Sequence, residues 1–111
     1  MARKASAFVR PPERRKYPRY GFQSEVELIT GSTVLRAFVT DISMGGMFVM
    51  ISTPFPPSAT FTGRLLFDPP LFLHCVVRRV IPGRGMGVSF ESLSDEVRAR
   101  LEKLLATILA G

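Results

Sequence analysis

The sequence of 111 residues contains no tryptophan, one cysteine and one histidine. A single cysteine, Cys75, cannot form an intramolecular disulfide, and with His74 alone it cannot complete a zinc site or a cysteine redox pair. A membrane-spanning helix needs about 18 consecutive apolar residues, and no uncharged apolar run in the sequence is that long. The basic N-terminus lacks the apolar stretch of a secretory signal. We therefore expect one globular, cytoplasmic domain without membrane insertion.

The formal net charge of +6 comes from one end of the chain. Seven of the 15 basic residues and one of the nine acidic residues lie in the first 20 positions, so the rest of the chain holds eight of each sign. We expect a flexible basic arm over residues 1–20 and a folded domain over residues 21–111. The concentration of positive charge in the arm indicates that the arm binds an anionic partner.

Hydrophobic patterning predicts six short strands that are separated by glycine and proline turns. The strands are expected at 24–29, 33–41, 47–52, 60–67, 71–81 and 86–90. Parallel pairing would need crossover helices that the pattern does not contain, so we expect an antiparallel barrel or sandwich. Near the C-terminus the period changes to that of a helix, with Ser94 as its N-cap. Its one apolar face is expected to cover an open end of the barrel, and a coiled-coil or partner-binding face is the alternative.

The sequence offers little for catalysis. His74 and Cys75 are neighbours in a predicted strand, where consecutive side chains point to opposite faces, so they cannot form a catalytic couple. The acidic residues are scattered, without paired carboxylates or metal-ligand spacing. The glycine-rich turn at residues 82–87 leads into a strand, which is unlike a phosphate-binding loop. We expect no enzymatic activity, no metal and no cofactor.

Two short segments carry side chains suited to a guanine nucleotide. The arm supplies Arg14, Arg15 and Arg19. Guanidinium groups match phosphate oxygens and the O6/N7 acceptor pair of guanine. The second segment runs from Asp41 to Gly46 at a predicted bend, where aspartate accepts from the N1–H and N2 amino group of guanine and glycine lets a flat ligand approach. Taken alone, this second segment favours an Asx-type turn.

The pattern Arg15-x-x-x-Arg19 followed by Asp41-x-Ser43-x-x-Gly46 resembles the two-part signature of PilZ domains, bacterial receptors for cyclic di-GMP. The segment 85–90 also resembles the closing strand of that family. The resemblance covers residues 13–108. It implies an all-β fold with one C-terminal helix, in which six antiparallel strands form a barrel, the arginine motif precedes the first strand and the second motif follows the second strand.

The resemblance also implies a function and a site. The implied function is a non-catalytic receptor in bacterial second messenger signalling, in motility or polysaccharide regulation. The implied ligand-binding residues are Arg14, Arg15, Arg19, Asp41, Ser43 and Gly46. In this family an arginine at the position of Arg14 is associated with an intercalated cyclic di-GMP dimer, so we expect a stacked pair of ligands. The arm is expected to close over the barrel and to signal to an unidentified effector protein.

Two other functions fit parts of the sequence. PilZ-like adaptors that bind a protein without ligand, as in pilus assembly, typically lack the arginine motif that this chain contains. A small basic barrel that binds nucleic acid would need stacking platforms, and only Tyr17 and Tyr20 flank the arm. The positions of Arg78, Arg79 and Arg84, in or beside the last predicted hairpin, do not follow from the sequence.

Overall fold

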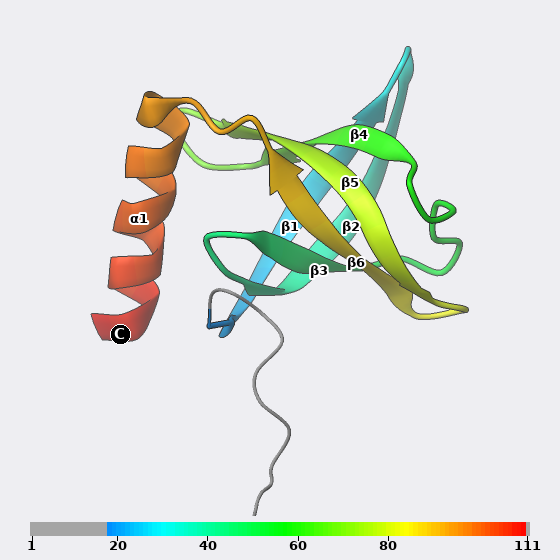
Figure 1. Ribbon diagram of the computed structural model, residues 1–111, viewed down its shortest axis with the longest axis horizontal. Helices are drawn as coiled ribbons and strands as arrows, with labels where there is room; N and C mark the ends of the chain where they lie inside the picture. Colours follow the sequence, from blue (N-terminus) through cyan, green and yellow to red (C-terminus); the bar gives the residue numbers. More distant parts are fainter. Residues whose placement is uncertain (1–17, 111) are drawn as a thin grey trace, which may run out of the picture.

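The computed structural model of the protein describes residues 18–110, which form a closed β-barrel and one helix (Figure 1). The elements are β1 (Tyr20–Thr30), β2 (Thr33–Ile42), β3 (Gly46–Met50), β4 (Thr60–Leu65), β5 (Leu71–Ile81), β6 (Gly85–Glu91) and α1 (Asp95–Ala110). The predicted fold class, a barrel of six antiparallel strands with one C-terminal helix, is confirmed.

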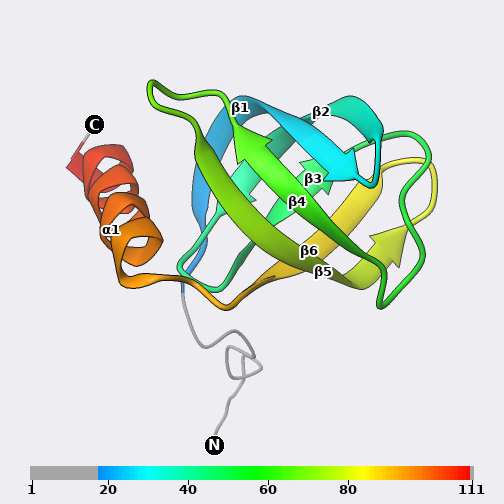
Figure 2. The ribbon, with the colours of Figure 1, turned by 90° about the horizontal axis from the view of Figure 1, so that it is seen from above.

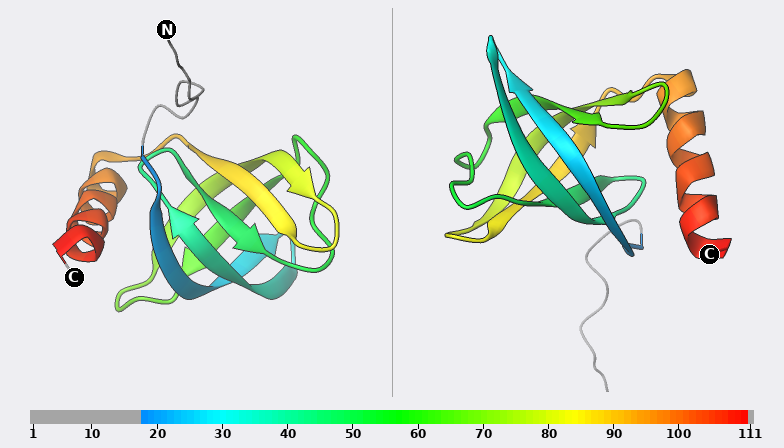
Figure 3. Two further views of the ribbon diagram at one scale, coloured as in Figure 1. Left: turned by 90° about the horizontal axis from the view of Figure 1, so that it is seen from below. Right: turned by 180° about the vertical axis from the view of Figure 1, so that it is seen from behind.

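The strands run around the barrel in the order β1-β2-β3-β6-β5-β4, and the pairing of β4 with β1 closes the barrel. Figure 2 shows the barrel from above, and Figure 3 shows it from below and from behind; in each view α1 lies outside the ring of strands. Closure gives every strand two neighbouring strands, although residues 33–37 of β2, at the tip of the β1–β2 hairpin, pair with β1 alone.

Apolar and polar side chains alternate along β1, so that one face of the strand is buried and the other is outside the barrel. Val26 and Leu28 are fully buried in the core. Glu25 and Glu27 point to the outer face, where they form ion pairs with arginines of β2 and β4. A period of two with one apolar face is the pattern from which this strand was predicted.

Several strand ends differ from the predicted ones, most of them by one or two residues. β1 begins at Tyr20, four residues before the predicted strand, because Tyr20 pairs with Ile42 and Gly21 pairs with Asp41. The register shifts between Gly21 and Ser24, and this irregularity interrupts the alternation that marks a strand in the sequence. β3 begins at Gly46, which was predicted to belong to the bend.

Helix α1 packs on the barrel through one face. Leu101 and Leu105 are buried in the hydrophobic core, and Arg100 donates hydrogen bonds to backbone carbonyls of the loop between β4 and β5. The predicted N-cap is present, since the Oγ atom of Ser94 accepts the backbone N–H of Val97 at 3.1 Å. In the described part of the chain, no helix has the length and apolar character to cross a membrane.

The side chains of His74 and Cys75 lie on opposite faces of β5, as predicted. Cys75 is 1% exposed, and burial raises the pKa of its thiol from 9.0 to about 12. Because the thiolate is the reactive form, we expect iodoacetamide to label the folded protein at pH 8 at least about 1,000-fold more slowly than the unfolded protein. Mass spectrometry of both samples measures the two rates. Similar rates would show that the thiol reaches solvent in the folded state.

Candidate functional site

The bend between β2 and β3 is held by the side chain of Ser43. Its Oγ atom accepts the backbone N–H groups of Gly45 at 3.1 Å and Gly46 at 3.2 Å. The backbone N–H of Ser43 donates to the carbonyl of Gly46 at 2.8 Å. Ser43 is 4% exposed and is the one buried polar residue in the described part of the chain. The bend is therefore closed by the side chain of Ser43, whereas the Asx-type turn that the segment favours when taken alone would be closed by Asp41, which instead accepts from Arg19.

Gly46 allows two strands to approach each other. A Cβ atom on this residue would lie 2.0 Å from the backbone oxygen of Val88 in β6. Any side chain at this position would therefore separate β3 from β6. The structure gives Gly46 a packing role, and its contact with a ligand, like that of Ser43, stays a prediction.

Arg19 and Asp41 form an ion pair at the start of this bend. An Nη atom of Arg19 donates to Oδ1 of Asp41 at 2.8 Å. The register of the strands explains the contact, because Gly21 pairs with Asp41 and Arg19 precedes Gly21 by two residues, on the same face. The two residues, 22 positions apart in the sequence, thus meet on the outer face of the barrel.

The ion pair is only partly satisfied. The side chains of Arg19 and Asp41 are 21% and 32% exposed. The Nε atom of Arg19 is buried and has no hydrogen-bond partner among the described residues. Among residues 18–110, Asp41 accepts through Oδ1 alone, from Arg19, so Oδ2 keeps its capacity as an acceptor toward other groups. The pair therefore leaves an acceptor, Oδ2 of Asp41, to offer to a ligand, whereas Nε of Arg19 is closed off from solvent.

Two of the predicted site residues, Arg14 and Arg15, lie outside the described residues. The structure therefore brings together Arg19, Asp41, Ser43 and Gly46, all within or next to the first two strands and the bend. Their roles in binding stay predictions.

One neighbour of the site was missed by the sequence analysis. Phe48 pairs with Asp41 across β2 and β3, and the two side chains leave the barrel on the same face. The sequence contains a signal for this, because a bend of known length fixes which residues of the two strands face each other. The register shift between Val39 and Asp41 hides that signal.

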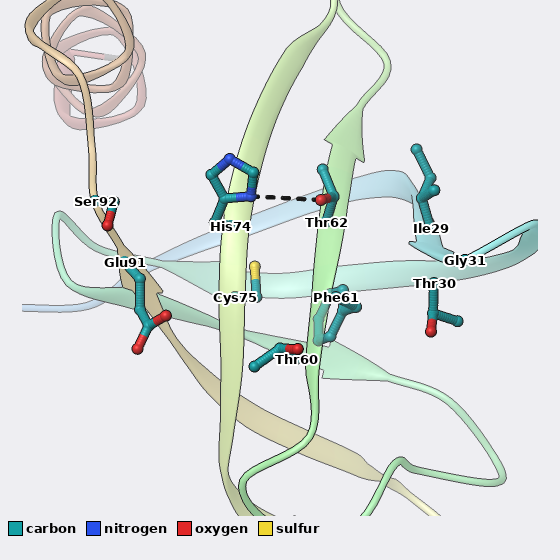
Figure 4. A pocket seen from close by; sticks show the side chains of 10 residues that line it. All are labelled: Ile29, Thr30, Gly31, Thr60, Phe61, Thr62, His74, Cys75, Glu91 and Ser92. Atoms are coloured by element: carbon teal, nitrogen blue, oxygen red, sulfur yellow. Dashed lines mark hydrogen bonds between the residues drawn. The ribbon is translucent and has the colours of Figure 1, made fainter.

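The two side chains of the ion pair are not among the residues that line two hollows of the surface. An apolar groove lies where the last turns of α1 face the bend, and its lining includes Tyr20, Met44 and Leu105. A polar hollow of about 590 Å³ lies at the far end of β1, where His74 Nδ1 is 3.5 Å from Oγ1 of Thr62 (Figure 4). The predicted site residues do not line the polar hollow. Within residues 18–110, no three His, Cys, Asp or Glu side chains gather to hold a metal.

The PilZ domain family model matches residues 13–107 of the chain. PilZ domains are non-catalytic binding or adaptor domains. The matched range contains the arginine motif, the bend and the helix, which is nearly the whole chain. A search of curated proteins finds no match.

Solved structures share the fold. The PilZ domain of YcgR from Escherichia coli, determined with c-di-GMP, aligns with a TM-score of 0.71 and 18% identity over 88% of this chain and 93% of its own. The Klebsiella pneumoniae MrkH–c-di-GMP complex aligns with a TM-score of 0.74 and 20% identity over 88% of this chain and 53% of MrkH. The Bacillus subtilis inhibitor of motility MotI aligns with a TM-score of 0.70 and 19% identity over 83% of this chain and 49% of MotI. The chain thus spans about half the length of MotI and MrkH.

Proposed function

The chain belongs to the PilZ domain family, and from this membership we propose that it is a non-catalytic receptor for cyclic di-GMP. The YcgR domain and MrkH were both solved with c-di-GMP, and this ligand carries the two chemical features that the candidate site addresses. These are the donor edge of guanine and the anionic phosphodiester. A cytoplasmic location belongs to the same proposal.

The contact between Arg19 and Asp41 is the observation that supports this proposal most. Asp41 Oδ2 is available to accept from the N1–H and N2 amino group of guanine. Arg19 retains donors that match the O6/N7 edge or a phosphate oxygen. The Asp41 carboxylate and the Arg19 guanidinium lie 2.8 Å apart. In this proposal they bind two edges of one guanine without a large rearrangement of the barrel.

The arm completes the site in this proposal. Arg14 and Arg15 precede Arg19 by five and four residues, which is close enough for their guanidinium groups to reach a ligand seated at Asp41. Fixing an arm residue costs about 1–2 kcal/mol in conformational entropy. A hydrogen bond to a charged group returns about 1.5–3 kcal/mol. Only a ligand that touches several arginines at once offsets the cost, so closure of the arm is coupled to binding.

The closed arm changes the surface that the protein offers to another protein. We therefore propose that the receptor passes its signal to an effector protein that contacts this surface. Motility and polysaccharide synthesis are the processes to test first, since MotI is named as an inhibitor of motility and another structure of this fold is the PilZ domain of CeSA from a cellulose-synthesizing bacterium.

Isothermal titration calorimetry with cyclic di-GMP tests the receptor proposal. We expect saturable binding at micromolar protein concentration, and no saturable binding of GMP or GTP. Absence of heat with cyclic di-GMP, in a sample shown to be folded by circular dichroism, would reject the proposal and favour an adaptor that does not bind ligand.

The identity of residue 14 is expected to set the number of ligands. A third guanidinium in the arm offsets the charge of two crowded dianions and stacks on a base. We expect the wild-type chain to bind two cyclic di-GMP molecules and the Arg14→Leu variant to bind one. Calorimetric stoichiometry measures both, with Lys4→Leu as a control that removes one positive charge from the same arm. An unchanged ratio in Arg14→Leu would contradict the stacked pair.

A further inference from the structure

The tip of the β1–β2 hairpin has an unpaired strand edge. Residues 33–37 of β2 pair with β1 on one side, whereas the pairing of β2 with β3 begins only at Phe38. Figures 1 and 3 show that this tip projects beyond the other strands. Among residues 18–110, none of the backbone hydrogen bonds of loops and turns involves residues 33–37. This stretch, which we call the open edge, is therefore available to pair with a further strand.

The geometry of the hairpin decides which backbone groups face the open edge. Thr30 pairs with Thr33 around a two-residue turn, in which Gly31 has a φ of 59°. In such a hairpin the closing pair exchanges both of its hydrogen bonds, and hydrogen-bonded pairs then alternate with non-hydrogen-bonded pairs. Every second residue from Thr33 thus directs its backbone groups to β1. Val34 and Arg36 direct theirs, one N–H and one C=O each, to the open edge.

The side chains of the open edge do not protect it against pairing. Val34 is 53% exposed and Leu35 is 38% exposed. Edge strands that stay unpaired commonly carry a proline, a lysine or an inward-pointing charge. The one charged residue among residues 33–37 is Arg36, and its guanidinium forms an ion pair with Glu25 of β1, on the side away from the open edge. The open edge therefore presents apolar side chains and backbone groups without a free repelling charge.

The open edge is complementary to itself. Two copies can pair as antiparallel strands about a two-fold axis at Leu35. Val34 of one copy then lies opposite Arg36 of the other, so the edge-facing N–H and C=O groups of both residues find partners. Leucine lies opposite leucine at the axis, and no like charges lie directly opposite each other. A register centred on Arg36 places two arginines opposite each other, and one centred on Val34 places Arg36 opposite the turn.

We propose that the protein forms a two-fold dimer in which the open edges of two copies pair as antiparallel strands. This inference goes beyond the receptor function and does not depend on it. Asp41 follows Leu35 by six residues in β2, or about 20 Å. The dimer therefore leaves both candidate sites far from its axis, and it should form without cyclic di-GMP.

The size of the open edge sets the strength of the dimer. Only residues 33–37 of each copy pair across the axis. A stable protein–protein interface uses about 20–30 residues from each partner, so this contact belongs to the weak and reversible class. We expect a dissociation constant between about 10 μM and about 1 mM.

Sedimentation equilibrium of the full chain without ligand, over the same concentration range, measures the association. Leu35→Lys and Leu35→Glu each place like charges opposite each other at the axis, so each variant alone should dimerise at least about 10-fold more weakly than the wild type. An equimolar mixture of the two variants should regain the dimer, because lysine then lies opposite glutamate. The matched control is Leu66→Lys, since Leu66 is 37% exposed in the loop after β4. This control should associate like the wild type.

Val34→Pro tests the pairing of the backbone itself. Proline at this position removes an N–H that faces the open edge and keeps the hydrogen bonds to β1. We expect a folded chain, with a circular dichroism spectrum like that of the wild type, whose dimer is at least about 10-fold weaker.

Each contrary result identifies a different failure. A wild-type chain that stays monomeric at about 1 mM would overturn the dimer and leave the open edge to a strand of another protein. A dimer that survives both Val34→Pro and Leu35→Lys, or a mixture of the charge variants that stays monomeric, would also overturn pairing through the open edge. None of these results bears on the receptor proposal, which the calorimetry with cyclic di-GMP tests separately.

Discussion

Replacement of Asp41 by alanine is expected to weaken cyclic di-GMP binding by about 100-fold or more. In the proposed site the variant removes the acceptor of two guanine hydrogen bonds, each worth about 1.5–3 kcal/mol when one group is charged. It also releases Arg19 from the position at which the ion pair holds it. Because that pair is partly exposed, its loss should change the free energy of unfolding by no more than about 1 kcal/mol. Calorimetry and thermal unfolding measure the two effects separately.

The matched control for this variant is Glu25→Ala. Glu25 forms an exposed ion pair with Arg36 at 3.4 Å on the outer face of the barrel, so its removal also takes away one negative charge and one arginine contact. We expect its affinity for cyclic di-GMP to stay within about twofold of the wild type. Equal weakening by both variants would attribute the effect to net charge rather than to contact with guanine.

Replacement of Gly46 by alanine is expected to lower the free energy of unfolding by about 2–4 kcal/mol. The added Cβ would lie 2.0 Å from a backbone oxygen of β6. Backbone cannot move aside as a flexible side chain can, so β3 and β6 must separate. Denaturant unfolding followed by circular dichroism measures the change.

Gly21→Ala is the control for this second prediction. No atom lies within 4 Å of the Cβ position of Gly21, so we expect a change within about 0.5 kcal/mol. A Gly46→Ala variant as stable as Gly21→Ala would show that the glycine of the bend is not required by strand packing. Its place in the motif would then have to come from the ligand alone.

Much of the barrel could be predicted from alternating apolar and polar residues, because one face of each strand packs in the core and is apolar. Val26 and Leu28 are buried between outward glutamates, and this pattern survives in the sequence. The first residues of β1 do not show it, because the register shift between Gly21 and Ser24 breaks the period of two. The helix was predictable from its apolar face and from the N-cap at Ser94.

The site was less predictable than the fold. The order of the two motifs places Arg19 near Asp41 once the first two strands form a hairpin, and their contact follows from that register. The role of Ser43 could not be predicted from the sequence, because a serine in a bend can contact a ligand or accept hydrogen bonds from the backbone. In this structure its Oγ atom accepts from the backbone of the bend. The faces of β5 on which Arg78 and Arg79 lie could not be predicted. A bulge inserts one residue into the strand, and no feature of the sequence marks its position.

The crystal structure of the whole chain with cyclic di-GMP bound is the most direct test of the receptor proposal. The proposal predicts that the N1 and N2 atoms of one guanine lie within hydrogen-bond distance of the Asp41 carboxylate. It also predicts that the guanidinium of Arg19 contacts the same nucleotide. A ligand bound elsewhere on the barrel, with Asp41 paired only to Arg19 as in the free protein, would contradict it.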